Sequence, residues 1–134
     1  MSHIATVEIE FKDLDCLAKA CTKCGVELRR DQKQFTWYGG RVSDCDAAIA
    51  VPGNSKAYEI GVHLEGGKIR LAYDPWCGGM GMQNHVAFED DMRGLGKLQQ
   101  AYAVEVARKQ AKKQGFSVRE QVQADGRIKL TLAR

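Results

Sequence analysis

The sequence lacks any long apolar run. No stretch approaches the roughly 18 residues that a transmembrane helix needs. The N-terminus, MSHIATVEIEF, also lacks the basic and then apolar order of a signal peptide. These absences argue against a helical membrane protein and a secreted protein, and we expect a cytoplasmic protein.

The sequence also lacks a large excess of positive or negative charge, and proline is scarce. The 20 basic residues are nearly balanced by 17 acidic ones, and the net charge of +3 is too small to indicate nucleic-acid binding by itself. The chain has 2 Pro against 14 Gly, with 44% hydrophobic and 28% charged residues. A chain of 134 residues with this composition can bury roughly 68–70% of its unfolded surface. We therefore predict a single domain over residues 1–134.

The order of patterns predicts an α+β fold. IATVEIEF alternates as a strand does, and Asp13 is a candidate N-cap for a helix that ends at Gly25. Short strands are predicted at VELRR, QFTWYGG and AAIAV, and a hairpin at 57–74 around Gly66 and Gly67. KLQQAYAVEVARKQAKKQ predicts a long helix, and 116–133 a second hairpin that turns at Asp125 and Gly126.

These elements predict a mostly antiparallel sheet with two main helices packed on one face. TKCGVELRR and KKQGFSVRE each run from a helix end through glycine into a strand. This internal similarity suggests a ferredoxin-like layout of the two helices.

Five cysteines without a secretion signal indicate reduced thiols. Cys16, Cys21 and Cys24 have the C-x4-C-x2-C spacing of plant-type two-iron ferredoxins, with Cys45 or Cys77 as a conceivable fourth ligand. Their segment favours helix, however, and at about 100° per residue Cys16 and Cys21 point roughly 140° apart. We interpret Cys21 and Cys24 as small core residues, with a metal site or redox-sensing thiols as alternatives.

A long irregular loop is predicted at about 75–96. It carries DPWCGGMGMQNH, in which Trp76, Cys77 and His85 are candidate binding residues. Cys77 and His85 could form a nucleophilic pair. The loop matches neither a dinucleotide-binding nor a Walker glycine pattern. Loops of this length inside a compact domain are usually functional or mobile, so we treat this loop as a candidate partner-binding or active-site segment.

Two further groups are candidates for binding. Trp37, Tyr38 and Arg41 surround a turn, where aromatic rings beside an arginine can stack on bases or peptides. Arg108, Lys109, Lys112 and Lys113 lie in the last turns of the long helix, where cations favour the helix dipole. A phosphate-contacting patch is the alternative role of these four residues.

Several motifs resemble one known family. They are MSHIATVEIEFKDLDCLAKA, the YGG ahead of DAAIAV, YEIGVHLEGG with the following YDPW, and QQAYAVEVARKQAKKQGFSVREQVQADGRIKLTLAR. Together they resemble the hypothetical chloroplast open reading frame 35 family, a domain of unknown function numbered 1257. The resemblance implies a fold rather than an activity. The family generally has leucine and alanine where this chain has cysteines in its first helix, which favours the core interpretation of those thiols.

We therefore predict a non-catalytic protein-binding or adaptor module that presents a sheet edge or the 75–96 loop to a protein partner, with no cofactor or metal. The sequence shows no convergent carboxylates and no Ser/His/Asp arrangement. One alternative is a metal- or thiol-dependent redox protein that uses Cys77, His85 and Cys45. A second is nucleic-acid binding through the aromatic turn and the basic helix end.

Overall fold

A computed structural model describes residues 5–9, 13–88 and 92–134 of the chain. Its largest sheet has five antiparallel strands in the order β1-β7-β6-β5-β2. Their bounds are Ala5–Ile9, Lys68–Tyr73, Ile60–Glu65, Ala47–Ala50 and Glu27–Arg29. β6 and β7 form the predicted hairpin around Gly66 and Gly67. The α+β class and the antiparallel pairing are thus confirmed.

Each face of this sheet is buried against a different neighbour. Ile49, Val62 and Leu71 belong to one core cluster together with residues of the helices. Ala48 and Ala72 belong to a second cluster with Phe35 and Cys45. Because successive side chains of a strand point to opposite faces, β5 is buried on both sides, which explains why AAIA is a continuous apolar run.

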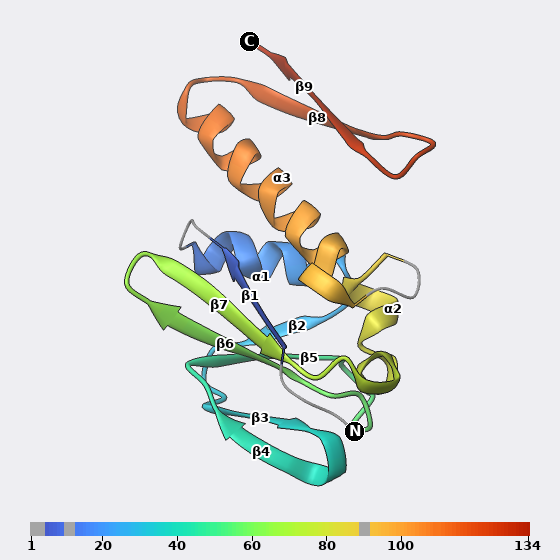
Figure 1. The fold of residues 1–134 in the computed structure, drawn as a ribbon. Coiled ribbons are helices and arrows are strands. Elements are labelled where there is room, and N and C mark those ends of the chain that lie inside the picture. The colour runs from blue at the N-terminus through green and yellow to red at the C-terminus, as the bar shows by residue number, and fades with distance from the viewer. Residues whose placement is uncertain (1–4, 10–12, 89–91) are drawn as a thin grey trace.

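Helix α1 spans Leu14–Lys23 and covers one face of the sheet (Figure 1). Asp13 caps it as predicted, since its Oδ1 accepts a hydrogen bond from the Cys16 N–H at 3.0 Å. The chain leaves the helix at Gly25, two residues after Lys23, and the φ of Gly25 is 80°, in the left-handed region that glycine adopts readily. Cys16 is buried as well as Cys21 and Cys24, so this helix buries more of its thiols than the sequence predicted.

Helix α3 spans Gly96–Lys113 and packs against α1. Beyond this contact it leads to the last two strands, β8 (Ser117–Val122) and β9 (Ile128–Ala133) (Figure 1). Within the described residues no helix is long and apolar enough to cross a membrane.

The expectation of one sheet was wrong, because two hairpins form separate two-stranded sheets. β3 (Gln34–Trp37) pairs with β4 (Arg41–Asp44) and places Phe35 on the outer face of the main sheet. β8 pairs with β9, turning at Asp125 and Gly126 as predicted. In the main sheet, β1 is an edge strand that pairs with β7. This strand order does not show the ferredoxin-like layout, which stays a prediction.

The segment predicted as an irregular loop holds several short turns. They are η2 (Trp76–Gly81), α2 (Gln83–Val86) and η3 (Arg93–Leu95). Met82 and Val86 from this segment are fully buried against the helix-side core. Residues 89–91 of the predicted loop lie outside the described residues. Where it is described, the segment is therefore packed into the fold.

Candidate functional site

Two of the segments singled out in the sequence meet in the structure. Tyr38 begins the short turn η1 (Tyr38–Gly40) between β3 and β4, and Trp76 begins η2. Their ring centroids lie 5.0 Å apart at an interplanar angle of 76°, an edge-to-face pair. Each residue keeps 37% of its surface exposed. The fold thus builds an aromatic pair that neither segment could supply alone.

The backbone beside Trp76 makes a left-handed turn. Cys77, Gly78, Gly79 and Met80 have φ values of 48°, 61°, 64° and 53°. Glycine adopts this conformation readily, whereas other residues lose about 1–2 kcal/mol each in it. A hydrogen bond from the segment before β6 holds the turn in place. The Tyr58 N–H donates it to the Gly79 carbonyl oxygen at 2.8 Å. Strained backbone that is held this firmly is often found at functional sites.

Asp74 directly follows β7, and its backbone oxygen lies beside Gly79 of this turn. It is only 1% exposed, and its Oδ1 accepts a hydrogen bond from the Trp76 N–H at 3.0 Å. Its Oδ2 is buried and has no hydrogen-bond partner among the described residues. A buried carboxylate oxygen without a partner costs stability. Asp74 therefore positions Trp76 at an energetic cost to the fold.

Tyr58 connects these groups. Burial raises the pKa of its phenol, and electrostatic interactions with Asp74, Cys77 and Tyr38 raise it further. These effects place the side chains of Asp74, Cys77 and Tyr38 in the surroundings of the Tyr58 phenol. Sequence reasoning missed Tyr58 and Asp74. The signal for Asp74 was its place in Y-D-P-W, directly after a predicted strand.

A cavity of about 450 Å³ lies beside the segment 53–59, which also contacts η2 through the Tyr58 N–H. Among its described lining residues there is neither Tyr38 nor Trp76. Glu59 lines this cavity and is held by two contacts. Its Oε1 accepts a hydrogen bond from the Thr36 N–H at 2.8 Å, and its Oε2 lies 3.7 Å from Arg29 Nη1. Sequence reasoning missed this cavity, because its walls come from β2, β3 and the turn after β5.

Trp37 and Arg41 lie opposite each other at the turn end of the same hairpin, on either side of η1. The Arg41 guanidinium carbon is 5.5 Å from the Trp37 ring centroid. The Trp37 indole N–H donates to Ser43 Oγ at 3.0 Å, and the ring packs against the cluster around Phe35. Trp37 thus supports the hairpin, whereas Tyr38 points toward Trp76.

The thiols and the imidazole of the proposed redox set have different surroundings in the structure. His85 Nδ1 lies 3.2 Å from the Cys24 carbonyl oxygen, at the end of α1. Cys45 is buried with Phe35 on the outer face of the sheet, and Cys77 is exposed. In the described part of the chain, no three His, Cys, Asp or Glu side chains are grouped so that they could hold a metal. The geometry therefore gives the metal alternative no site among these residues.

The α1 thiols are core residues, as the preferred interpretation held. Cys16, Cys21 and Cys24 are all buried and free. Burial is the main cause that raises the pKa of each thiol, to about 12 for Cys21. Protonated, covered thiols are poor nucleophiles and poor metal ligands.

The basic residues of α3 lie on another part of the molecule. Arg108 forms an ion pair with Glu120, and Lys109 Nζ lies 2.5 Å from Asp13 Oδ2. Figure 1 shows the C-terminal end of α3 far from the β3–β4 hairpin. The aromatic turn and the basic helix end therefore lie on different parts of the molecule, and nucleic-acid binding through them stays a prediction.

The fold and the site define a small α+β protein. It carries a partly exposed aromatic pair on the turns that follow strands β3 and β7. The chain belongs to the family described as Protein of unknown function (DUF1257), whose model matches residues 20–131. This match confirms the family resemblance seen in the sequence. A comparison with the curated proteins finds no match, and a comparison with the solved structures finds none either.

Proposed function

We propose that this chain is a cytoplasmic protein-binding module whose Tyr38 and Trp76 anchor a protein partner. The observation that carries the proposal is the edge-to-face contact of these two partly exposed rings from distant loops. Tyrosine, tryptophan, methionine and arginine are the residues most enriched at protein interfaces. Met80 and Arg41, on the two loops beside the rings, are exposed as well.

The rings are held in place before any partner arrives. Trp76 is tied by its N–H to Asp74, and η2 is tied to residue 58. An anchor that is already ordered loses little conformational entropy on binding. The unpaired Asp74 oxygen and the left-handed Cys77 and Met80 are costs that a binding role would explain.

The experiment compares the wild-type protein with Tyr38→Ala/Trp76→Ala and with Leu132→Ala. Leu132 is also exposed, but it lies on the C-terminal hairpin. Each tagged form is purified from the native host, the co-purifying protein is identified, and its affinity is measured with purified components. We expect one stoichiometric partner, which the double variant binds at least about a hundredfold more weakly. Leu132→Ala should bind it normally.

Circular dichroism must show that all three forms are folded. The proposal fails if the partner binds the folded double variant as tightly as the wild type. It also fails if no protein associates with the wild type under mild crosslinking.

A further inference from the structure

A groove runs between α1 and α3, on the helix side of the molecule. Two adjoining cavities of about 330 and 340 Å³ form it, and they share Lys19 and Glu105. The remaining lining residues are Ala18, Thr22, Lys23, Arg108, Lys109, Lys112 and Lys113. We call this feature the α1–α3 groove. Of the nine lining residues that the structure describes, seven can carry a charge, and six of these are basic.

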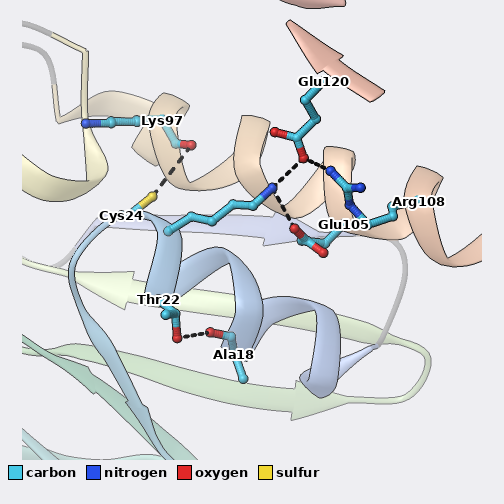
Figure 2. A network of polar contacts seen from close by, with 8 residues as sticks. Ala18, Thr22, Cys24, Lys97, Glu105, Arg108 and Glu120 are labelled. Carbon is cyan, nitrogen blue, oxygen red and sulfur yellow. Dashed lines mark hydrogen bonds and ion pairs between the residues drawn. The ribbon is translucent and has the colours of Figure 1, made fainter. Parts of the chain in front are cut away.

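The carboxylate in the groove is already neutralised. Glu105 is 5% exposed, and its Oε1 lies 2.7 Å from Lys23 Nζ. The same ammonium lies 2.6 Å from Glu120 Oε1, which also accepts a hydrogen bond from Arg108. Figure 2 shows Glu105, Glu120 and Arg108 joined in this network. The network ties α1, α3 and β8 together, so the groove walls are fixed.

The charges that remain are positive. Lys109 is paired with Asp13 across the groove. Lys19, Lys112 and Lys113 have no carboxylate partner within residues 13–88 and 92–134. The helix dipole accounts for cations at the end of α3, but Lys19 lies in the middle of α1. Three uncompensated ammonium groups from two helices thus border one groove.

We propose that the α1–α3 groove binds a compact anion that carries several phosphate groups. Lysine ammonium groups act as point charges that suit phosphate. Arg108, whose guanidinium could grip a planar carboxylate, is engaged by Glu120. Among the described residues that line the groove, none is an aromatic residue on which a base could stack. Its ligand is therefore recognised by dense negative charge rather than by a base.

The test titrates the full chain with inorganic tripolyphosphate by calorimetry, at about 50 and 200 mM salt. We compare the wild type with Lys112→Ala/Lys113→Ala and with Lys19→Ala. The matched control is Lys56→Ala/Lys129→Ala, which removes the same charge from exposed positions outside the groove. Each groove variant should bind at least about tenfold more weakly, since each lysine lost removes a charge-assisted contact. The control should change affinity less than about threefold, because distant charges are screened.

A nucleoside triphosphate, a single-stranded RNA and a polyglutamate peptide serve as further probes. If the nucleoside triphosphate binds like tripolyphosphate with the same variant sensitivity, the phosphates alone are recognised, as proposed. The proposal is overturned if tripolyphosphate does not bind at low salt, or if the groove and control variants weaken binding equally. It is also overturned if RNA or the peptide binds more tightly than tripolyphosphate through the same lysines. Tyr38→Ala/Trp76→Ala should leave tripolyphosphate binding unchanged, so this result is independent of the proposed protein partner.

Discussion

The ring of Phe35 lies directly on the backbone of Gly61. A Cβ atom built at Gly61 would stand 2.4 Å from both Cδ1 and Cε1 of the Phe35 ring. Gly61 pairs with Ala48 on one side and Ala72 on the other, so small residues form a row across the outer face of the sheet. This row lets the β3–β4 hairpin, and with it Tyr38, approach the main sheet.

Gly61→Ala should therefore destabilise the fold. The added methyl group has no room, and overpacking of this kind costs about 1–3 kcal/mol. Urea denaturation measures the free energy of unfolding. Gly67→Ala is the control, because nothing lies within 4 Å of a Cβ there and its φ is not left-handed. Gly61→Ala/Phe35→Leu should be less destabilised than the sum of its single variants. Equal stabilities of the two alanine variants would show that Phe35 does not occupy the row.

Asp13 should make stability depend on pH in the acid range. The Lys109 ammonium, followed by the Cys16 N–H, lowers the pKa of Asp13 from 3.8 to about 2. Because the pKa is lower in the folded chain, its stabilisation is present above about pH 4 and is lost as the pH falls toward 2. Asp13→Asn keeps an N-cap but removes the charge. Between pH 5 and pH 2, the free energy of unfolding should fall in both proteins. The fall should be about 1–2 kcal/mol larger in the wild type than in Asp13→Asn. Asp31→Asn, at an exposed carboxylate, should follow the wild-type curve.

One thiol should react in the folded protein. Cys77 is exposed, whereas Cys16, Cys21, Cys24 and Cys45 are buried. A pKa of about 12 for Cys21, against an ordinary 9.0, leaves about a thousandfold less thiolate at neutral pH. Ellman's reagent should label one thiol rapidly in the native wild type and none in Cys77→Ser. All five thiols should react after unfolding. Rapid labelling of two or more native thiols would revive the redox alternative.

Asp74→Asn should stabilise the fold and disturb Tyr58. Asparagine retains an oxygen for the Trp76 N–H, but it carries no charge to bury. Removing the charge should raise the unfolding free energy by only about 1 kcal/mol, because the amide nitrogen of asparagine is then buried without a partner in place of Oδ2. The pKa of Tyr58 should fall toward its ordinary value, because the charge of Asp74 raises it in the wild type. Calorimetry and ultraviolet titration measure the two effects. Asp44→Asn, at an exposed position, should change neither, and destabilisation by Asp74→Asn would contradict this view of the site.

Much of the fold could be predicted because local chemistry decides it. The Asp13 cap, the stop at Gly25 and the turn at Asp125 and Gly126 were read from single residues, since caps and turns depend on hydrogen bonds to near neighbours. The burial of AAIA followed from its unbroken apolar run. The candidate residues Tyr38 and Trp76 were also visible, each as an aromatic beside a glycine turn.

The tertiary structure alone decided how these pieces combine. Tyr38 meets Trp76 because the β3–β4 hairpin packs on the outer face of the sheet, where Gly61 leaves space for Phe35. The same folding buries Cys45 on the outer face of the sheet and sets His85 against the end of α1, and the described residues form no metal-binding group of three. Lys19 joins Lys112 and Lys113 because α1 packs on α3. The sequence by itself determined helices, strands and turns, since these depend on near neighbours. Contacts between distant segments depend on which apolar faces pack together, and so only the folded chain placed the binding residues.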